Sequence, residues 1–120
     1  MAYTTVNKSS DYYSTKLYSG DNGTQSVTGV GFQPDFVWLK DYSTGYHNRT
    51  FNSVTGAGKN MITDNTNALQ TVDEGVTAFN SDGFTTKQGT TLEYNKSGVN
   101  YVSWNWKAGT TGSGTTTGSG

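Results

Sequence analysis

Clusters of glycine, asparagine and aspartate interrupt this chain repeatedly and leave only short segments between them. Such clusters mark turns, because glycine and Asx residues readily adopt the backbone conformations that tight turns need. The segments between them are rich in the β-branched and aromatic residues that strands favour, and none shows a sustained 3.6-residue apolar period. The clusters are Asp21-Asn22-Gly23, Ser43-Thr44-Gly45, Thr55-Gly56-Ala57-Gly58, Ser81-Asp82-Gly83 and Ser97-Gly98.

This pattern predicts an all-β sandwich or barrel of antiparallel strands. A chain of 120 residues has room for one such domain. Only 31% of the residues are hydrophobic but 13% are aromatic, so we expect a small core rich in aromatic side chains. The expected strands are residues 15–18, 25–28, 35–40, 48–52, 59–63, 76–80, 84–86 and 99–107, with a turn of helix within 65–74.

Charge and composition exclude several classes of function. The net charge of -1 argues against a protein that binds nucleic acid through phosphates. The chain has no cysteine and a single histidine, which excludes disulfides, cysteine zinc sites and any site that needs two histidines. No apolar run approaches the roughly 20 residues of a membrane span, so we expect no membrane insertion. The first residues lack the features of a secretory signal, and we therefore expect release into a cytosol.

The segment 101–107 alternates most clearly of all the predicted strands. Val102, Trp104 and Trp106 share one face, and the more polar residues between them share the other. We expect the valine and the tryptophans to face the core. The strand around Trp38 is apolar on both faces, which predicts a central position with cover on both sides. The predicted structural core therefore contains Trp38, Val102, Trp104 and Trp106.

The end of the chain differs in kind from the rest. Residues 110–120 contain only threonine, glycine and serine, a composition typical of flexible linkers. We therefore expect a β-sandwich domain at residues 1–109, followed by a linker or docking tail at 110–120.

Three segments of the chain resemble a known family. Residues 29–40 read GVGFQPDFVWLK, residues 79–84 read FNSDGF, and residues 101–109 read YVSWNWKAG. These segments, in this order, resemble a domain found in tail-fibre and virion structural proteins of phages that infect aquatic bacteria. Two departures stand out. Residues 52–56 read NSVTG where relatives often carry Asp-x-Val-Arg-Gly, and Asn105 stands where relatives carry a cysteine.

The resemblance implies a jelly-roll or lectin-like (concanavalin-like) sandwich, a role in the phage virion and no catalytic residues. We expect a non-enzymatic module of the tail-fibre or host-attachment apparatus, assembled in the host cytoplasm. Its expected partners are other virion proteins, further copies of itself, with a trimer as one form, and a bacterial surface glycan. A capsid decoration protein that stabilises the shell is the first alternative, and a glycan-degrading enzyme is the second.

The chemistry of the side chains favours binding over catalysis. Several acidic residues, such as Asp21, Asp64 and Asp82, lie beside asparagine or glycine, where a carboxylate typically closes a turn. Asp41 and Glu93 stay candidates for a glycosidase pair. His47 is expected at the surface. Residues 64–67 offer oxygen ligands for calcium but lack the pattern of an EF-hand loop. We expect no cofactor, no metal site and no catalytic residue.

The best candidates for glycan contact lie in one predicted loop. Tyr42 and Tyr46 offer aromatic faces for stacking on a sugar, and Asn48 and Arg49 offer hydrogen bonds. The alternative is that these tyrosines cap a small core and keep their hydroxyl groups in water.

Overall fold

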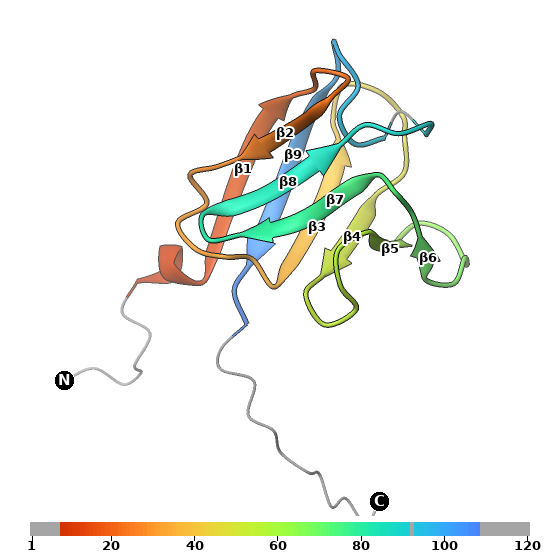
Figure 1. Ribbon diagram of the computed structural model, residues 1–120. Helices are drawn as coiled ribbons and strands as arrows, with labels where there is room; N and C mark the ends of the chain where they lie inside the picture. Colours follow the sequence, from red (N-terminus) through yellow and green to blue (C-terminus); the bar gives the residue numbers. More distant parts are fainter. Residues whose placement is uncertain (1–7, 92, 109–120) are drawn as a thin grey trace, which may run out of the picture.

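The computed structural model describes residues 8–91 and 93–108, and this part of the chain folds into two antiparallel sheets (Figure 1). The larger sheet has the strand order β1-β9-β3-β4-β5-β6, and the smaller sheet has the order β2-β8-β7. The elements are η1 (Ser9–Asp11), β1 (Tyr13–Ser19), β2 (Thr24–Val27), β3 (Phe36–Asp41), β4 (Arg49–Asn52), β5 (Lys59–Ile62), β6 (Gln70–Thr71), β7 (Gly75–Asn80), β8 (Gly83–Lys87) and β9 (Asn100–Trp106). The predicted all-β antiparallel sandwich is confirmed.

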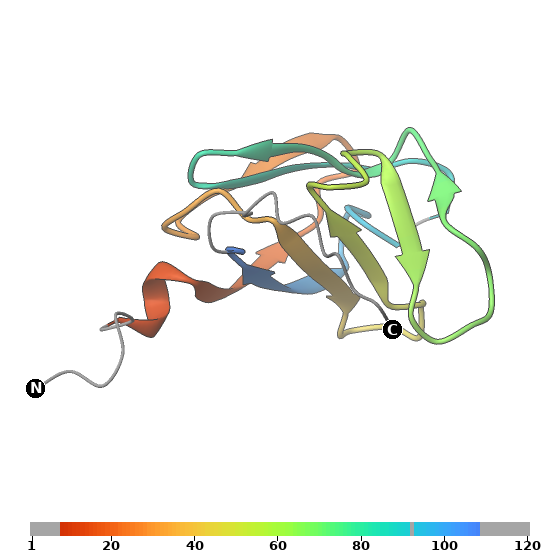
Figure 2. The ribbon, with the colours of Figure 1, turned by 90° about the horizontal axis from the view of Figure 1, so that it is seen from below.

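The two sheets lie face to face as layers, and the core fills the space between them (Figure 2). Five core side chains are inaccessible to solvent: Val37, Phe51 and Tyr101 of the larger sheet, and Val76 and Phe84 of the smaller one. Burial of these side chains supplies the main stabilisation of the fold. In the described residues, no helix has the length and apolarity of a membrane span.

The expected strands all overlap strands of the structure, but the expected helical turn is wrong. Within residues 65–74 the chain forms an Asx turn, in which the Asn67 amide donates to Asn65 Oδ1 over 2.6 Å, and then the short strand β6. Strand β6 pairs with β5 at the edge of the larger sheet, where Thr71 lies opposite Lys59. This pairing depends on a tertiary neighbour that local residue preferences do not reveal.

The expected core face of β9 is also wrong, although the predicted alternation is right. Tyr101, Ser103 and Asn105 face the smaller sheet and are inaccessible to solvent. Trp104 and Trp106 lie on the outer face, where Trp106 keeps 37% of its surface exposed. The inner face accepts Asn105 because its amide nitrogen finds acceptors there: Asn105 Nδ2 donates to Ser14 O over 3.1 Å and to Ser103 Oγ over 3.0 Å. Among the described residues, the Asn105 side-chain oxygen has no hydrogen-bond partner.

Trp38 of β3 shares this outer face and is 36% exposed, so the expectation that both sides of β3 are covered is wrong. Val37 and Leu39 point inward from the same strand and are buried. Val102 is buried as expected, although it lies on the outer face, where it pairs with Leu17 of β1 and Lys40 of β3.

Two aspartates link the segments that carry the family resemblance: Asp82, which is exposed, and Asp35, which is partly buried. Asp82 accepts hydrogen bonds from the amides of Gly29 and Gly31 over 2.9 and 2.7 Å, and these bonds lower the pKa of its carboxyl group. Asp35 accepts from the Ala108 amide and from Ser53 Oγ, both over 2.9 Å. These aspartates therefore close the connections between strands.

Candidate functional site

The outer face of the larger sheet carries a group of tryptophan side chains that line a hollow. Trp38, Trp104 and Trp106 line, together with Asn48, a shallow hollow of about 290 Å³. Strand pairing assembles it, because Trp38 of β3 lies directly opposite Trp104 of β9. Trp106 follows on the same face because side chains alternate along a strand. In the described part of the chain, the smaller sheet covers only the other face of these strands.

Ring packing and one hydrogen bond fix the shape of this hollow. The ring centroids of Trp38 and Trp104 lie 5.9 Å apart with an interplanar angle of 68°, so the two rings pack edge to face. The Trp38 indole nitrogen donates to Asn48 Oδ1 over 3.3 Å. These contacts hold the rings in one arrangement before any ligand arrives.

A second set of aromatic rings continues the same face toward the edge of the sheet. Trp106 lies between Tyr13 of β1 and Phe36 of β3 in the strand register. Its ring centroid is 5.2 Å from that of Tyr13 and 5.3 Å from that of Phe36. Five aromatic side chains therefore form one continuous surface across three strands, which we call the aromatic face: Tyr13, Phe36, Trp38, Trp104 and Trp106.

The structure separates the four residues that the sequence suggested for glycan contact. Asn48 lines the hollow beside the tryptophans. Tyr42 is 53% exposed and Tyr46 is partly buried, but neither lines the hollow. Arg49 is buried, so the expectation that it would contact a glycan beside Asn48 is wrong.

Arg49 points inward because a buried carboxylate binds it there. Its Nε donates to Glu93 Oε2 over 2.6 Å, and Nη2 contacts the same oxygen. Nη1 donates to Asn60 Oδ1 over 3.0 Å and to Gln70 Oε1 over 2.9 Å. The guanidinium group also lies 5.7 Å from the ring centre of Tyr94. The arginine thus joins β4, β5, β6 and the segment before β9.

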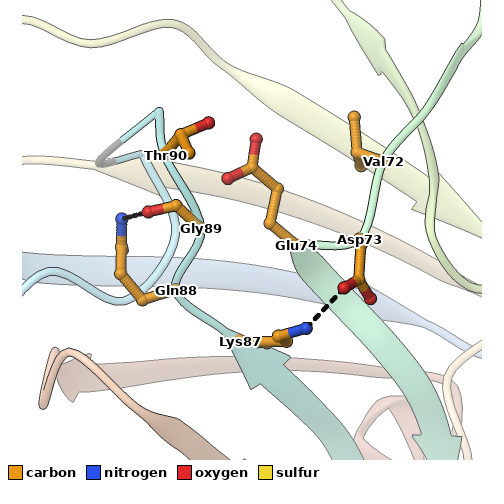
Figure 3. A pocket seen from close by; sticks show the side chains of 7 residues that line it. All are labelled: Val72, Asp73, Glu74, Lys87, Gln88, Gly89 and Thr90. Carbon is orange, nitrogen blue, oxygen red and sulfur yellow. Dashed lines mark hydrogen bonds and ion pairs between the residues drawn. The ribbon is translucent and has the colours of Figure 1, made fainter.

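Two further hollows lie where β6 and β7 meet the segment that follows β8. Their volumes are about 320 and 460 Å³, and Glu74 lines both. Figure 3 shows the first hollow, with Glu74 pointing into it and the ion pair of Lys87 and Asp73 beside it. The Glu74 carboxylate accepts from Thr91 Oγ1 over 2.9 Å and from the Thr91 amide over 3.3 Å. These bonds connect the segment after β8 to the residue that precedes β7.

The candidate glycosidase pair is also engaged in structural contacts. Asp41 Oδ1 accepts from the amides of Ser43 and Thr44, both over 2.8 Å, and so closes the turn after β3. Glu93 is the partner of Arg49. His47 is exposed, as expected, and its Nδ1 lies 3.0 Å from Asp64 Oδ1.

Residues 8–91 and 93–108 contain no group of three or more His, Cys, Asp or Glu side chains that could hold a metal ion.

The sequence predicts the three tryptophans in the core because large hydrophobic side chains are usually buried, and it therefore does not predict the aromatic face. One signal in the sequence could have found them. A chain with only 31% hydrophobic residues cannot cover both faces of a large sheet with apolar layers, so some strand faces must stay open.

Comparison with known proteins gives a family but no characterised relative. No curated protein and no solved structure matches the chain. One family model matches residues 8–120, and the family is described as a domain of unknown function, DUF7483. Because this match spans nearly the whole chain, the protein belongs to the DUF7483 family.

Proposed function

We propose that this chain is a non-enzymatic glycan-binding module of a phage tail fibre and that it takes part in attachment to the host. The observation that carries the proposal is the hollow formed by Trp38, Trp104, Trp106 and Asn48. Exposed tryptophans that are ordered by mutual packing are costly to leave in water, and a partner that covers them removes that cost.

The chemistry of the hollow supports a sugar as this partner. The C–H faces of pyranose rings stack on aromatic rings, while their hydroxyl groups need hydrogen-bond partners at the edge of the stack. The hollow offers three indole rings and the Asn48 amide within one site. Apolar walls with a few placed polar groups are typical of small-molecule sites.

The position of the carboxylates supports binding without turnover. Hydrolysis of a glycosidic bond needs two carboxyl groups about 5 to 10 Å apart on either side of the bond. Among the residues that the structure describes, no carboxylate lines the tryptophan hollow. Three buried acids have structural contacts: Asp41 closes a turn, Glu74 accepts hydrogen bonds from Thr91, and Glu93 pairs with Arg49.

The resemblance to phage proteins supports the place of action. Residues 29–40 and 101–109, which carry most of the resemblance, contain all three tryptophans of the hollow. A shallow site of this kind binds a single sugar weakly, but several copies on one fibre bind with much greater avidity. We therefore propose a homo-oligomer, such as a trimer, joined to other virion proteins.

Binding of the labelled chain to host cells and to their isolated surface polysaccharide tests this function. We expect saturable binding without release of reducing ends, and a loss of at least about tenfold in affinity in Trp38→Ala and Trp106→Ala. Tyr42→Ala is the matched control, because this aromatic ring is exposed outside the hollow. Loss of binding in the tyrosine variant alone would place the site in the 42–48 loop. Release of reducing ends would support the glycan-degrading alternative.

One observation favours the alternative of a capsid decoration protein. The outer face also exposes aliphatic and thioether side chains, with Leu17 at 66% and Met61 at 43% exposure, and such residues suit contact with another protein. Antibody-gold labelling of intact phage particles separates the two roles. Label on tail fibres supports attachment, whereas label spread over the head supports decoration.

A further inference from the structure

We infer that the aromatic face binds a single, neutral, β-linked glycan chain with equatorial substituents, laid across strands β1, β9 and β3. This inference rests on the proposed glycan-binding function and names the class of glycan. It follows from the length of the aromatic face, the tilt of its rings, its charge and its polar edges.

The length of the face exceeds a single sugar ring. Tyr13, Trp106 and Phe36 lie on three neighbouring strands in register. Adjacent strands are about 4.8 Å apart, so the outer two rings of this row are separated by about 10 Å. A parallel row, which starts at Thr15 and continues through Trp104 and Trp38, lies beside it. A ligand that covers either row must contain consecutive sugar units.

The tilt of the rings selects a single chain over a crystalline surface. A flat polysaccharide crystal needs coplanar rings to lie on. Here the interplanar angles are 52° between Tyr13 and Trp106, 60° between Phe36 and Trp106, and 68° between Trp38 and Trp104. These angles produce a corrugated surface with notches, and an individual chain can adapt to such notches.

The charge of the face selects a neutral glycan. The outward residues of β1, β9 and β3 include one charged side chain, Lys40, and its Nζ donates to the Tyr46 carbonyl over 2.6 Å. Lys40 lies opposite Val102, two residues beyond the pair formed by Trp38 and Trp104, so the two aromatic rows themselves hold no cation that would replace the hydration of a uronic or sialic acid.

Stacking and edge contacts select the stereochemistry. A pyranose whose substituents are all equatorial presents C–H bonds on both faces, so successive units of an extended β-linked chain can stack whichever face they turn. An α-linked chain coils away from the surface. The equatorial hydroxyl groups then meet polar atoms at the border: Thr15 Oγ1, which lies 2.9 Å from the Tyr13 hydroxyl, and Asn48 beside Trp38.

Calorimetry with the full chain and defined sugars tests the inference. The probes are cellobiose, cellohexaose, chitohexaose, maltohexaose, alginate and microcrystalline cellulose. We expect at least one β-linked hexasaccharide to bind about fivefold or more tighter than cellobiose, since each added stacked ring contributes to affinity. We expect no binding of maltohexaose, alginate or crystalline cellulose.

Variants of Tyr13 separate an extended site from a single-sugar site. Tyr13→Ala removes the outer ring of the row, so the ratio of hexasaccharide affinity to cellobiose affinity falls toward one. Tyr13→Phe keeps the ring and keeps the gain. Thermal unfolding confirms that both variants are folded. Trp38→Ala weakens binding of both sugars, because Trp38 lines the central hollow.

The outcomes distinguish failure of this inference from failure of the proposed function. Equal affinity for short and long β-linked sugars, or tighter binding of maltohexaose, alginate or crystalline cellulose, overturns the inference and leaves glycan binding intact. Absence of binding to every probe and to host polysaccharide overturns both.

Discussion

Removal of the guanidinium group of Arg49 should destabilise the fold far more than loss of a surface ion pair. In Arg49→Met the aliphatic volume stays, but the Glu93 carboxylate, 7% exposed, loses the partner that compensates its burial. Asn60 Oδ1 and Gln70 Oε1 lose a donor at the same time. Breaking a buried pair in this way costs about 3–5 kcal/mol. We expect about 3 kcal/mol, because the hollow lined by Arg49 and Gln70 admits water to the orphaned groups.

Urea unfolding followed by circular dichroism measures this change in the free energy of unfolding. Lys87→Met is the control, because it breaks the ion pair with Asp73, whose side chain is 93% exposed. We expect a loss of less than about 0.5 kcal/mol there. The double variant Arg49→Met with Glu93→Gln should recover part of the loss, because it removes the buried charge together with its partner.

A loss below about 1 kcal/mol in Arg49→Met, similar to that of the control, would refute this reasoning. It would mean that the Glu93 carboxylate reaches water or another cation once the arginine is gone. A double variant less stable than Arg49→Met would show that the remaining hydrogen bonds of Glu93, and not its uncompensated charge, determine the cost.

Three further predictions concern backbone strain and titration. Gly75→Ala should lose about 2 kcal/mol or more in urea unfolding, because Gly75 has φ 74° and a Cβ atom there would lie 2.4 Å from the Phe51 ring. The lowered pKa of Asp82 stabilises the fold above about pH 4, and this contribution is lost as pH falls through the folded-state pKa. Asp82→Asn should therefore show a shallower loss of stability in acid; an unchanged slope would contradict this. Burial raises the pKa of Tyr94 and Tyr101 to about 12, so stability should fall as pH rises from about 10 toward 12. Tyrosinate absorbance should show late ionisation that Tyr101→Phe reduces.

Local sequence patterns predict the strands because strand and turn preferences depend on residues that are close together along the chain. Turn residues such as Asn22 and Gly83 adopt the positive φ angles that only a few residue types accept, and they separate the segments as expected. The alternation within residues 101–107 correctly placed Trp104 and Trp106 on one face. The short strand β6 was missed because two residues carry no periodicity.

The site could be predicted only in part. The tyrosines of the 42–48 loop predict a site there, and the structure shows that this loop contributes Asn48 to the hollow. Arg49 was placed on the wrong side because its partner Glu93 lies 44 residues away, beyond any local pattern.

The sequence by itself determined the fold class, the positions of the strands other than β6 and the sets of residues that share a face. Which face of each strand turns inward was decided only by the tertiary structure. Alternation is a local property of an extended backbone, whereas the inward direction depends on the second sheet and on the hydrogen bonds that meet each polar side chain there. Ser103 and Asn105 lie on the inner face, where the Asn105 amide nitrogen donates to Ser14 O and Ser103 Oγ. The same alternation therefore places Trp104 and Trp106 on the outer surface, beside Trp38.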